Sequence, residues 1–126
     1  MAELRMRRVY EMGAANDDAD DGMRVLVDRL WPRGLARDKV RIDHWLRGVA
    51  PSDELRRWFG HDPARWQEFQ TRYHSELRGS AHPDLALLRH LSTSPGRITL
   101  LYAARDEARN NAVALKAFLE QQRGAP

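Results

Sequence analysis

The sequence predicts an α/β fold, a small two-layer or three-layer sandwich in which a mostly parallel sheet of three or four strands is flanked by helices. Two observations predict it. Segments with strand character alternate with segments of helical periodicity along the chain. Residues 25–27 form a continuous apolar run, Val-Leu-Val, which is typical of a strand covered on both faces. The length of 126 residues suits one domain, so we expect residues 1–126 to fold as a single unit.

Four segments have strand character, and two of them are clearly the most apolar. The two most apolar segments are residues 23–30 and 97–104. Because apolar strands are typical of the covered centre of a parallel sheet, we expect these two strands to lie side by side there. Residues 5–10 predict a first strand with loose alternation. Residues 42–46 predict a short strand or an irregular segment.

Residues 13–22 combine turn-forming residues with four aspartates, which predicts a flexible acidic loop. A cation site is the alternative interpretation of this acidity, and it stays open. The loop lacks the position-by-position pattern and the closing Glu of an EF-hand loop. Elsewhere in the sequence we expect neither a metal site nor a cofactor.

The middle third of the chain predicts helices with recognisable ends. Ser52 is expected to cap the first helix and Gly60 to end it. Asp62 and Pro63 predict the start of a second helix, because Pro is favoured at the first helical position. The buried stripe of this second helix follows a spacing of three and four residues and consists of Trp66, Phe69, Tyr73 and Leu77, with Trp66 largely buried.

Two further helices complete the pattern. Leu85, Leu88 and Leu91 have the spacing of a third helix. A last helix is expected over residues 106–122, with Ala108 among its inward-facing residues.

Composition excludes several classes of protein. The chain has no cysteine, which excludes disulfides, thiolate nucleophiles and Cys-ligated zinc. Its longest apolar run, residues 98–104, is too short to span a membrane, and charges occupy the N-terminus where a signal peptide needs an apolar stretch. We therefore expect a soluble, cytoplasmic protein with no membrane partner. Its oligomeric state stays open.

The net charge of +3 is small, although the pI is near 9.8 and 19 of the 21 basic residues are arginine. Arginine recognises planar anions through two parallel hydrogen bonds, which lysine cannot do. A basic surface is also the footprint of nucleic-acid binders. The sequence thus favours an anionic small molecule as partner and keeps nucleic acid as the weaker alternative.

Polar side chains follow two of the predicted strands. Asp28 and Arg29 end the second strand and are followed by Trp31 and Arg33. The fourth strand is followed by a second polar set, which consists of Arg105, Asp106, Asn110 and Asn111. In an open α/β sheet, ligands bind beyond the carboxyl ends of the strands. If the two strands are neighbours, we expect these groups to line one pocket.

The pocket residues have candidate roles. Asp28 and Arg29 are the candidate catalytic groups, with Asp28 acting as an acid, a base or a positioning group. Arg29, Arg33 and Arg105 are candidates for clamping an anion, aided by the free N–H groups that open the last helix. Trp31 is a candidate platform for stacking a ligand ring.

Each of these residues also has a structural interpretation. Asp28 and Arg29 would then form an internal ion pair, Asp106 would only cap the last helix, and Trp31 would belong to the core. Asn111 would satisfy a nearby carbonyl.

His61 lies between two predicted helices. It is either a cap or loop residue, or a group that points into the site as a general base. None of the five histidines has the spacing of a zinc site.

Three segments carry a resemblance to a known family. Residues 21–34 contain the string Val-Asp-Arg-Leu-Trp-Pro-Arg-Gly, residues 50–63 end in Gly-His-Asp-Pro, and residues 100–106 read Leu-Leu-Tyr-Ala-Ala-Arg-Asp. In this order, over nearly the whole chain, they resemble the YeaO-like branch of the domain of unknown function 488 family. The resemblance implies a small bacterial-type α/β domain with no settled activity.

The wider family implies a shared polar core. Its Asp-Val-Arg string with a following Pro-Arg or Pro-Ser segment is matched here by residues 28–33. Its Cys-Ala-Glu and Cys-His-Arg strings are replaced by Tyr-Ala-Ala at residues 102–104 and by the region of Asn110. The resemblance therefore supports Asp28 with the arginines and does not support a thiol mechanism.

Three functional hypotheses follow. The first is a small enzyme or sensor that acts on an anionic small molecule of the nucleotide or phosphate class. The second is a module that binds or processes nucleic acid, with Trp31 stacking on an unpaired base. The third is a non-catalytic domain that binds a protein partner. The sequence leaves open whether the protein is an enzyme.

Overall fold

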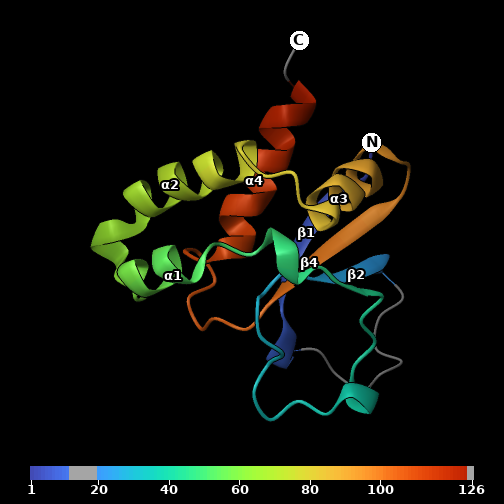
Figure 1. Cartoon of the computed structure of the whole chain (residues 1–126). Coiled ribbons are helices and arrows are strands. Elements are labelled where there is room, and N and C mark those ends of the chain that lie inside the picture. The colour runs from blue at the N-terminus through green and yellow to red at the C-terminus, as the bar shows by residue number, and fades with distance from the viewer. Residues whose placement is uncertain (12–19, 125–126) are drawn as a thin grey trace.

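A computed structural model describes residues 1–11 and 20–124, so most of the predicted acidic loop lies outside the described residues. One four-stranded sheet has the order β1-β4-β2-β3 and consists of β1 (Glu3–Arg8), β2 (Met23–Leu26), β3 (His44–Trp45) and β4 (Arg97–Tyr102). The three strand pairings are all parallel. The two apolar strands, β2 and β4, are therefore adjacent and central, as the sequence predicts (Figure 1).

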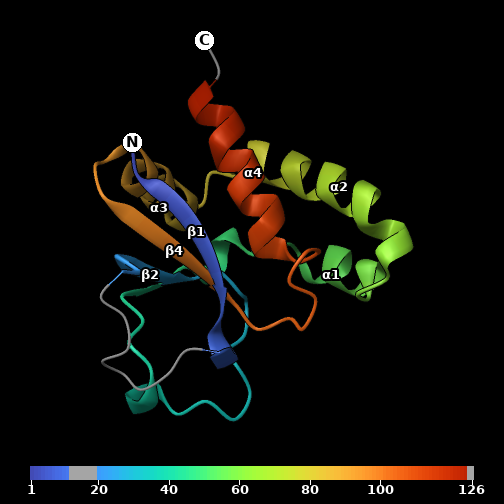
Figure 2. The same cartoon turned by 180° about the vertical axis from the view of Figure 1, so that it is seen from behind.

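The helices pack on one face of this sheet. They are α1 (Asp53–Phe59), α2 (Trp66–Arg78), α3 (Pro83–Thr93) and α4 (Asn111–Gly124). Alternate strand residues such as Val25 and Leu100 join them in the main hydrophobic core, because successive side chains of a strand point to opposite faces. Helix α4 lies between β1 and α2 (Figure 2).

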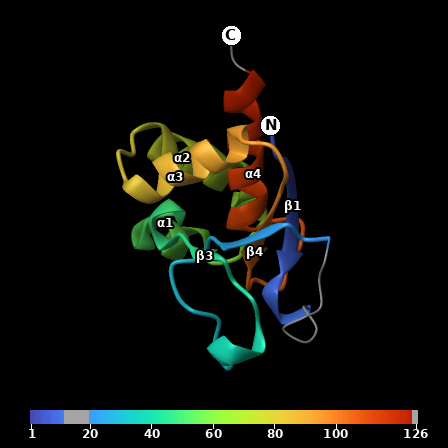
Figure 3. The same cartoon turned by 90° about the vertical axis from the view of Figure 1, so that its right-hand side faces the viewer.

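The other face is covered without a helix layer. Leu26 and Leu101 point to this side and pack in a second, smaller core with side chains from the segment that joins β2 to β3. Figure 3 shows this segment, coloured cyan to teal, on the opposite side of β2 and β3 from helices α1 to α3. The fold is thus a two-layer α/β sandwich with an irregular cover over its second face.

The ends of the first two helical segments are as predicted. The Ser52 hydroxyl accepts the Leu55 N–H at 3.1 Å, which caps α1. Gly60 ends α1 with a φ of 52°, a left-handed conformation that glycine adopts without steric cost. Asp62 accepts the Ala64 N–H at 2.9 Å, and Pro63 opens a short 3₁₀ turn that leads into α2.

The strand boundaries differ from the prediction by a few residues. β1 begins at Glu3, opposite Arg97 of β4, and ends at Arg8. β2 ends at Leu26 rather than at residue 30, although the Val27 N–H still bonds to the Leu101 oxygen at 3.2 Å. The predicted strand was too long because residues 28–30 form a bend and leave the ladder.

The last helix begins later than predicted. Asn110 is the residue that caps α4, because its Oδ1 accepts the Val113 N–H at 3.0 Å. Asp106 instead accepts the N–H groups of Ala108 and Arg109, at 2.9 and 3.1 Å, and so caps a turn in the preceding loop. Ala108 is exposed there, so its predicted inward position is wrong.

The buried stripe of α2 is confirmed except at Trp66. Phe69, Tyr73 and Leu77 are at most 4% exposed, whereas Trp66 is only partly buried. Trp66 occupies the first position of α2 and stacks against Phe69 with ring centroids 5.6 Å apart. We attribute its exposure to this position at the end of the helix.

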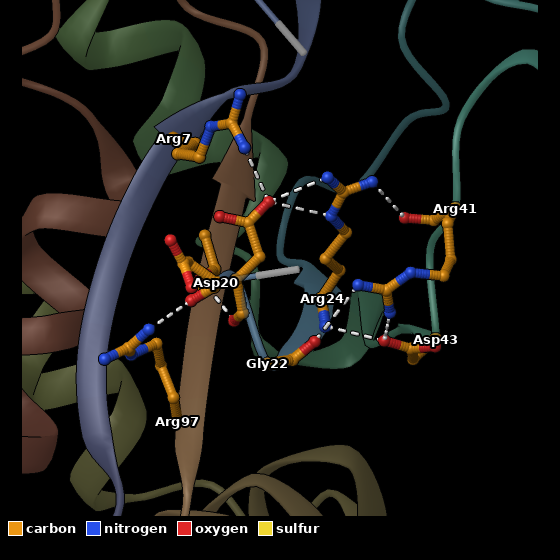
Figure 4. A network of polar contacts seen from close by, with 9 residues as sticks. Arg7, Asp20, Gly22, Arg24, Arg41, Asp43 and Arg97 are labelled. Atoms are coloured by element: carbon orange, nitrogen blue, oxygen red, sulfur yellow. Dashed lines mark hydrogen bonds and ion pairs between the residues drawn. The ribbon is translucent and has the colours of Figure 1, made fainter. Parts of the chain in front are cut away.

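A network of charges lies around the amino end of β2, and its central pair, Arg24 and Asp21, is buried. Arg24 is fully buried, and its guanidinium contacts Asp21 Oδ2 at 2.8 and 2.9 Å (Figure 4). Arg7 donates to the same carboxylate oxygen at 2.6 Å. The Arg24 backbone N–H donates to Asp43, which also pairs with Arg41. The network ties the end of the acidic loop to β1, β2 and the segment before β3.

Candidate functional site

A cleft of about 970 Å³ lies at the carboxyl ends of β1, β2 and β4. Its walls come from the loops after these strands, the loop before α1, and the aromatic residues Phe59 and Phe69. The nine residues that the sequence singled out all line it: Asp28, Arg29, Trp31, Arg33, His61, Arg105, Asp106, Asn110 and Asn111. The convergence follows from the adjacency of β2 and β4.

The cleft has an excess of positive charge. Five arginines line it, namely Arg8, Arg29, Arg33, Arg56 and Arg105, against the two carboxylates of Asp28 and Asp106. An apolar wall accompanies them, formed by Leu30, Trp31, Pro32, Phe59 and Phe69. Apolar walls with a few oriented polar groups are typical of small-molecule sites.

Asp28 is the most buried carboxyl group of the cleft. Its Oδ2 accepts the backbone N–H of Ala103 at 2.9 Å, and the Asn111 amide donates a further hydrogen bond. Burial raises the pKa of Asp28 above its usual value, and the two hydrogen bonds oppose that rise only in part. Among the described residues Asp28 forms no ion pair, so the pairing with Arg29 that the structural interpretation offered does not occur.

Arg29 points toward the loop before α1. Its Nη2 donates to the Pro51 oxygen at 3.1 Å, and its Nε lies 3.5 Å from Asp53. These contacts hold the loop against the end of β2. Arg29 still lines the cleft. Part of its guanidinium is already bound to this loop, so only the remainder is available to a ligand.

Arg33 and Arg105 have the opposite character. Both are exposed, and within the part of the chain that the structure describes neither guanidinium has a hydrogen bond or an ion pair. The backbone oxygen of Arg33 accepts the Tyr10 hydroxyl at 2.7 Å, which fixes the chain that carries this side chain. Two unpartnered guanidinium groups at one cleft are suited to bind an anion.

The loop from Asp106 to Asn111 is held by its own polar groups. Hydrogen bonds from Ala108 and Arg109 lower the pKa of Asp106 despite partial desolvation. The Asn110 amide donates to the Asp106 oxygen at 2.9 Å, and Asn110 is only 2% exposed. The Asn111 amide donates to the Val27 oxygen at 3.1 Å. These residues build one wall of the cleft and join the start of α4 to the end of β2.

Trp31 contributes to the cleft and to the second core. Its indole Nε1 donates to the Leu35 oxygen at 2.6 Å, and its ring meets Trp45 edge-on with centroids 5.5 Å apart. The guanidinium of Arg37 lies over the ring, 4.6 Å from its centroid. One face of the indole is thus already covered, which restricts Trp31 as a stacking platform.

His61 is an exposed loop residue at the rim. Its φ is 58°, a conformation that non-glycine residues rarely adopt, and its ring lies 6.2 Å from that of Phe59. It lines the cleft but lies on the α1 side.

Sequence reasoning missed Arg8 and Arg56. Arg8 ends β1 and donates to the Ala104 oxygen at 3.0 Å. The rule that ligands bind at carboxyl strand ends would have found it, once β1 was placed beside β4. Arg56 reaches the cleft from α1, and no local sequence signal marks it.

No group of three or more potential metal ligands occurs among the described residues. No helix in residues 20–124 has the length and apolarity needed to cross a membrane.

Comparison with known proteins assigns a family. A family model described as the inactive DUF488-N3 subclade matches residues 3–125. The chain belongs to this subclade. It is 47% identical over 116 residues to "Uncharacterized protein Rv3073c" of Mycobacterium tuberculosis (strain ATCC 25618 / H37Rv), and the match covers 92% of each chain. It is 33% identical to "Uncharacterized protein YeaO" of Escherichia coli (strain K12), over 92% of this chain and 96% of that protein. No solved structure matches.

Membership confirms the resemblance that the sequence motifs carry. The description calls this subclade inactive, and the chain contains no cysteine. What remains at the strand ends is Asp28 with its neighbouring arginines.

Proposed function

We propose that the cleft binds a small anion of the nucleotide or phosphate class and carries out no reaction on it. The observation that carries the proposal is the pair Arg33 and Arg105, two exposed guanidinium groups that line one cleft without a partner among the described residues. An anion would supply the acceptors that these groups lack.

The size and lining of the cleft agree with such a ligand. A volume of about 970 Å³ lies in the range of small-molecule sites. The apolar wall with Phe59 and Pro32 would contact a ring or sugar, while the arginines would contact the anionic group. The family description as an inactive subclade and the absence of cysteine support binding over catalysis.

A nucleic-acid module is the second candidate, and one cluster favours it. Next to the cleft, Arg47 lies 3.9 Å from the ring centroid of Trp45, and Arg37 lies over both Trp31 and Trp45. Guanidinium and indole groups together are typical of surfaces that bind single strands. Arg37 already covers one face of the Trp31 ring, so we rank this function second.

Thermal unfolding tests the proposal directly. Inorganic phosphate or a nucleoside monophosphate at about a hundred times its Kd should stabilise the wild type by about 2.7 kcal/mol. Arg33→Ala and Arg105→Ala should fold normally and lose most of this shift, because each removes a charged contact but little core.

Arg78→Ala is the matched control, because Arg78 is an exposed arginine at the end of α2 and does not line the cleft. Equal shifts in all four proteins would place the anion elsewhere and overturn the proposal. A single-stranded oligonucleotide that binds far more tightly than any mononucleotide would favour the second candidate.

A further inference from the structure

The two carboxylates of the cleft differ in what they already bind. Asp106 accepts two backbone N–H groups and also pairs with the Arg109 guanidinium at 3.3 Å. Asp28 accepts one backbone N–H and one amide. An ionised carboxylate offers about four acceptor positions, so Asp28 retains capacity for further donors, whereas Asp106 is largely saturated.

None of the five cleft arginines uses that capacity. Arg29, the sequence neighbour of Asp28, is bound to Pro51 and lies near Asp53. Arg8 donates to Ala104, and Arg56 lies near Asp53. Asp28 therefore keeps an acceptor inside an otherwise cationic cleft, with no ion pair to any described residue.

This arrangement is unfavourable for a simple anion. A carboxylate beside a bound phosphate repels it, and the repulsion is strong where burial lowers the effective dielectric constant. The repulsion is offset when the ligand places an N–H or O–H donor against Asp28, because hydrogen bonds to a charged group are strong. The cleft is thus built for a ligand with an anionic end and a donor end.

The wall of the cleft indicates what joins the two ends. Leu30, Pro32, Phe59 and Phe69 form an apolar surface along the same cleft. A flat ring packs on such a surface, whereas a bare sugar phosphate has little apolar area to bury there. We propose that Asp28 is a specificity-determining residue, and that the ligand is a nucleoside monophosphate whose base presents an N–H group to the Asp28 carboxylate. This inference rests on the proposed anion-binding function.

The experiment compares dissociation constants by isothermal titration for guanosine monophosphate, adenosine monophosphate, ribose 5-phosphate and inorganic phosphate. For the wild type we expect at least one nucleoside monophosphate to bind about ten- to a hundredfold more tightly than ribose 5-phosphate or phosphate. In Asp28→Asn this preference should fall by about tenfold, while phosphate binds as well as before or slightly better. Asn keeps an oxygen that accepts the Ala103 N–H, so the loop should keep its conformation.

Asp106→Asn is the matched control, because it removes the other carboxylate of the cleft, and it should leave the preference unchanged. Asp28→Ser is a second variant with the same expectation as Asp28→Asn, in case the amide perturbs the loop. The inference is overturned if phosphate binds the wild type without a preference for nucleotides, if ribose 5-phosphate binds as tightly as the nucleotides, or if both Asp28 variants keep the preference. The first of these outcomes leaves the proposed anion-binding function standing. If no phosphate compound binds the wild type, the proposed function itself fails.

Discussion

The two ends of β2 carry the same two residue types in opposite states. At the amino end, Arg24 is fully buried, and Asp21 receives both Arg24 and Arg7. At the carboxyl end, Asp28 has no ion pair among the described residues, and Arg33 has no partner there. Arginine and aspartate at one end satisfy each other, while at the other end they are held apart.

The difference follows from what covers each end. The segment between β2 and β3 closes over the amino end, where Arg24 also reaches the Arg41 oxygen at 3.4 Å. At the carboxyl end the chain opens into a cleft of about 970 Å³. Burial forces charges to pair, because an unpaired buried charge is costly, whereas an open cleft leaves pairing to water or a ligand. Charged residues with few partners at an open strand end thus indicate function, and fully paired ones indicate structure.

The largest effect is expected at the amino end. Arg24→Ala should reduce the free energy of unfolding by about 3–5 kcal/mol, because it breaks a buried pair by removing one partner. Urea denaturation measures this loss. Arg33→Ala is the comparison at the other end of the strand, and a loss for Arg24→Ala no larger than for Arg33→Ala would contradict the contrast between the two ends.

A smaller effect is expected for a structural residue within the cleft itself. Asn110→Ala removes the cap of α4 and leaves the Val113 N–H without its acceptor, so it should cost about 1–2 kcal/mol. Asn111→Ala removes the amide that donates to the Val27 oxygen and to Asp28, but it leaves no backbone N–H of α4 without an acceptor, so it should cost less. Thermal melts of the two variants test this order, and the reverse order would show that the bridge to β2 outweighs the cap.

The pH dependence of stability should have opposite signs at the two ends. Burial raises the pKa of Asp28. The folded protein therefore binds the Asp28 proton more tightly than the unfolded chain does. The free energy of unfolding relative to Asp28→Asn should fall as the pH rises from the unfolded pKa of this group through its higher folded pKa. For Asp43, burial raises the pKa, but hydrogen bonds from the Arg24 N–H and Arg41 outweigh it, so the net pKa is lowered. Stability relative to Asp43→Asn should therefore be present above the unfolded pKa and fall as the pH drops through the folded pKa.

Urea denaturation of the three proteins between about pH 3 and pH 7 measures both differences. If both stability differences change with pH in the same direction, the pKa values of Asp28 and Asp43 are not shifted in opposite directions.

The smallest effect on stability is expected for the unpartnered arginines. Arg33→Ala and Arg105→Ala should each change the free energy of unfolding by less than about 0.5 kcal/mol, since both side chains are exposed and make no contact that folding requires. Chemical denaturation without added anion checks this. A loss above about 1 kcal/mol for either variant would assign that arginine to structure.

Much of this arrangement is readable from the sequence, because it depends on local signals. The apolar runs of β2 and β4, the caps at Ser52 and Asp62 and the turn at Gly60 each follow from neighbouring residues. The position of the cleft follows from the same two strands, since polar residues come directly after them. Family motifs point to the same residues independently.

The rest depends on contacts between distant residues. Asp106 and Asn110 are both good capping residues, and only the packing of α4 decides that Asn110 is the cap. Nothing near Arg24 in the sequence indicates that its side chain is buried and pairs with Asp21, which Arg7 also contacts. The cover over the second face has no regular periodicity, so its packing on Leu26 and Leu101 could not be predicted.

The strand order has a consequence for synthesis on the ribosome. β1 pairs only with β4 among the described strands, and the two are separated by about ninety positions in the chain. During translation β1 therefore emerges long before its partner, and its backbone hydrogen-bonding groups stay in water until Tyr102 has left the exit tunnel. The central sheet must then form late, with most of the chain already present, which favours slow folding that depends on contacts distant in sequence.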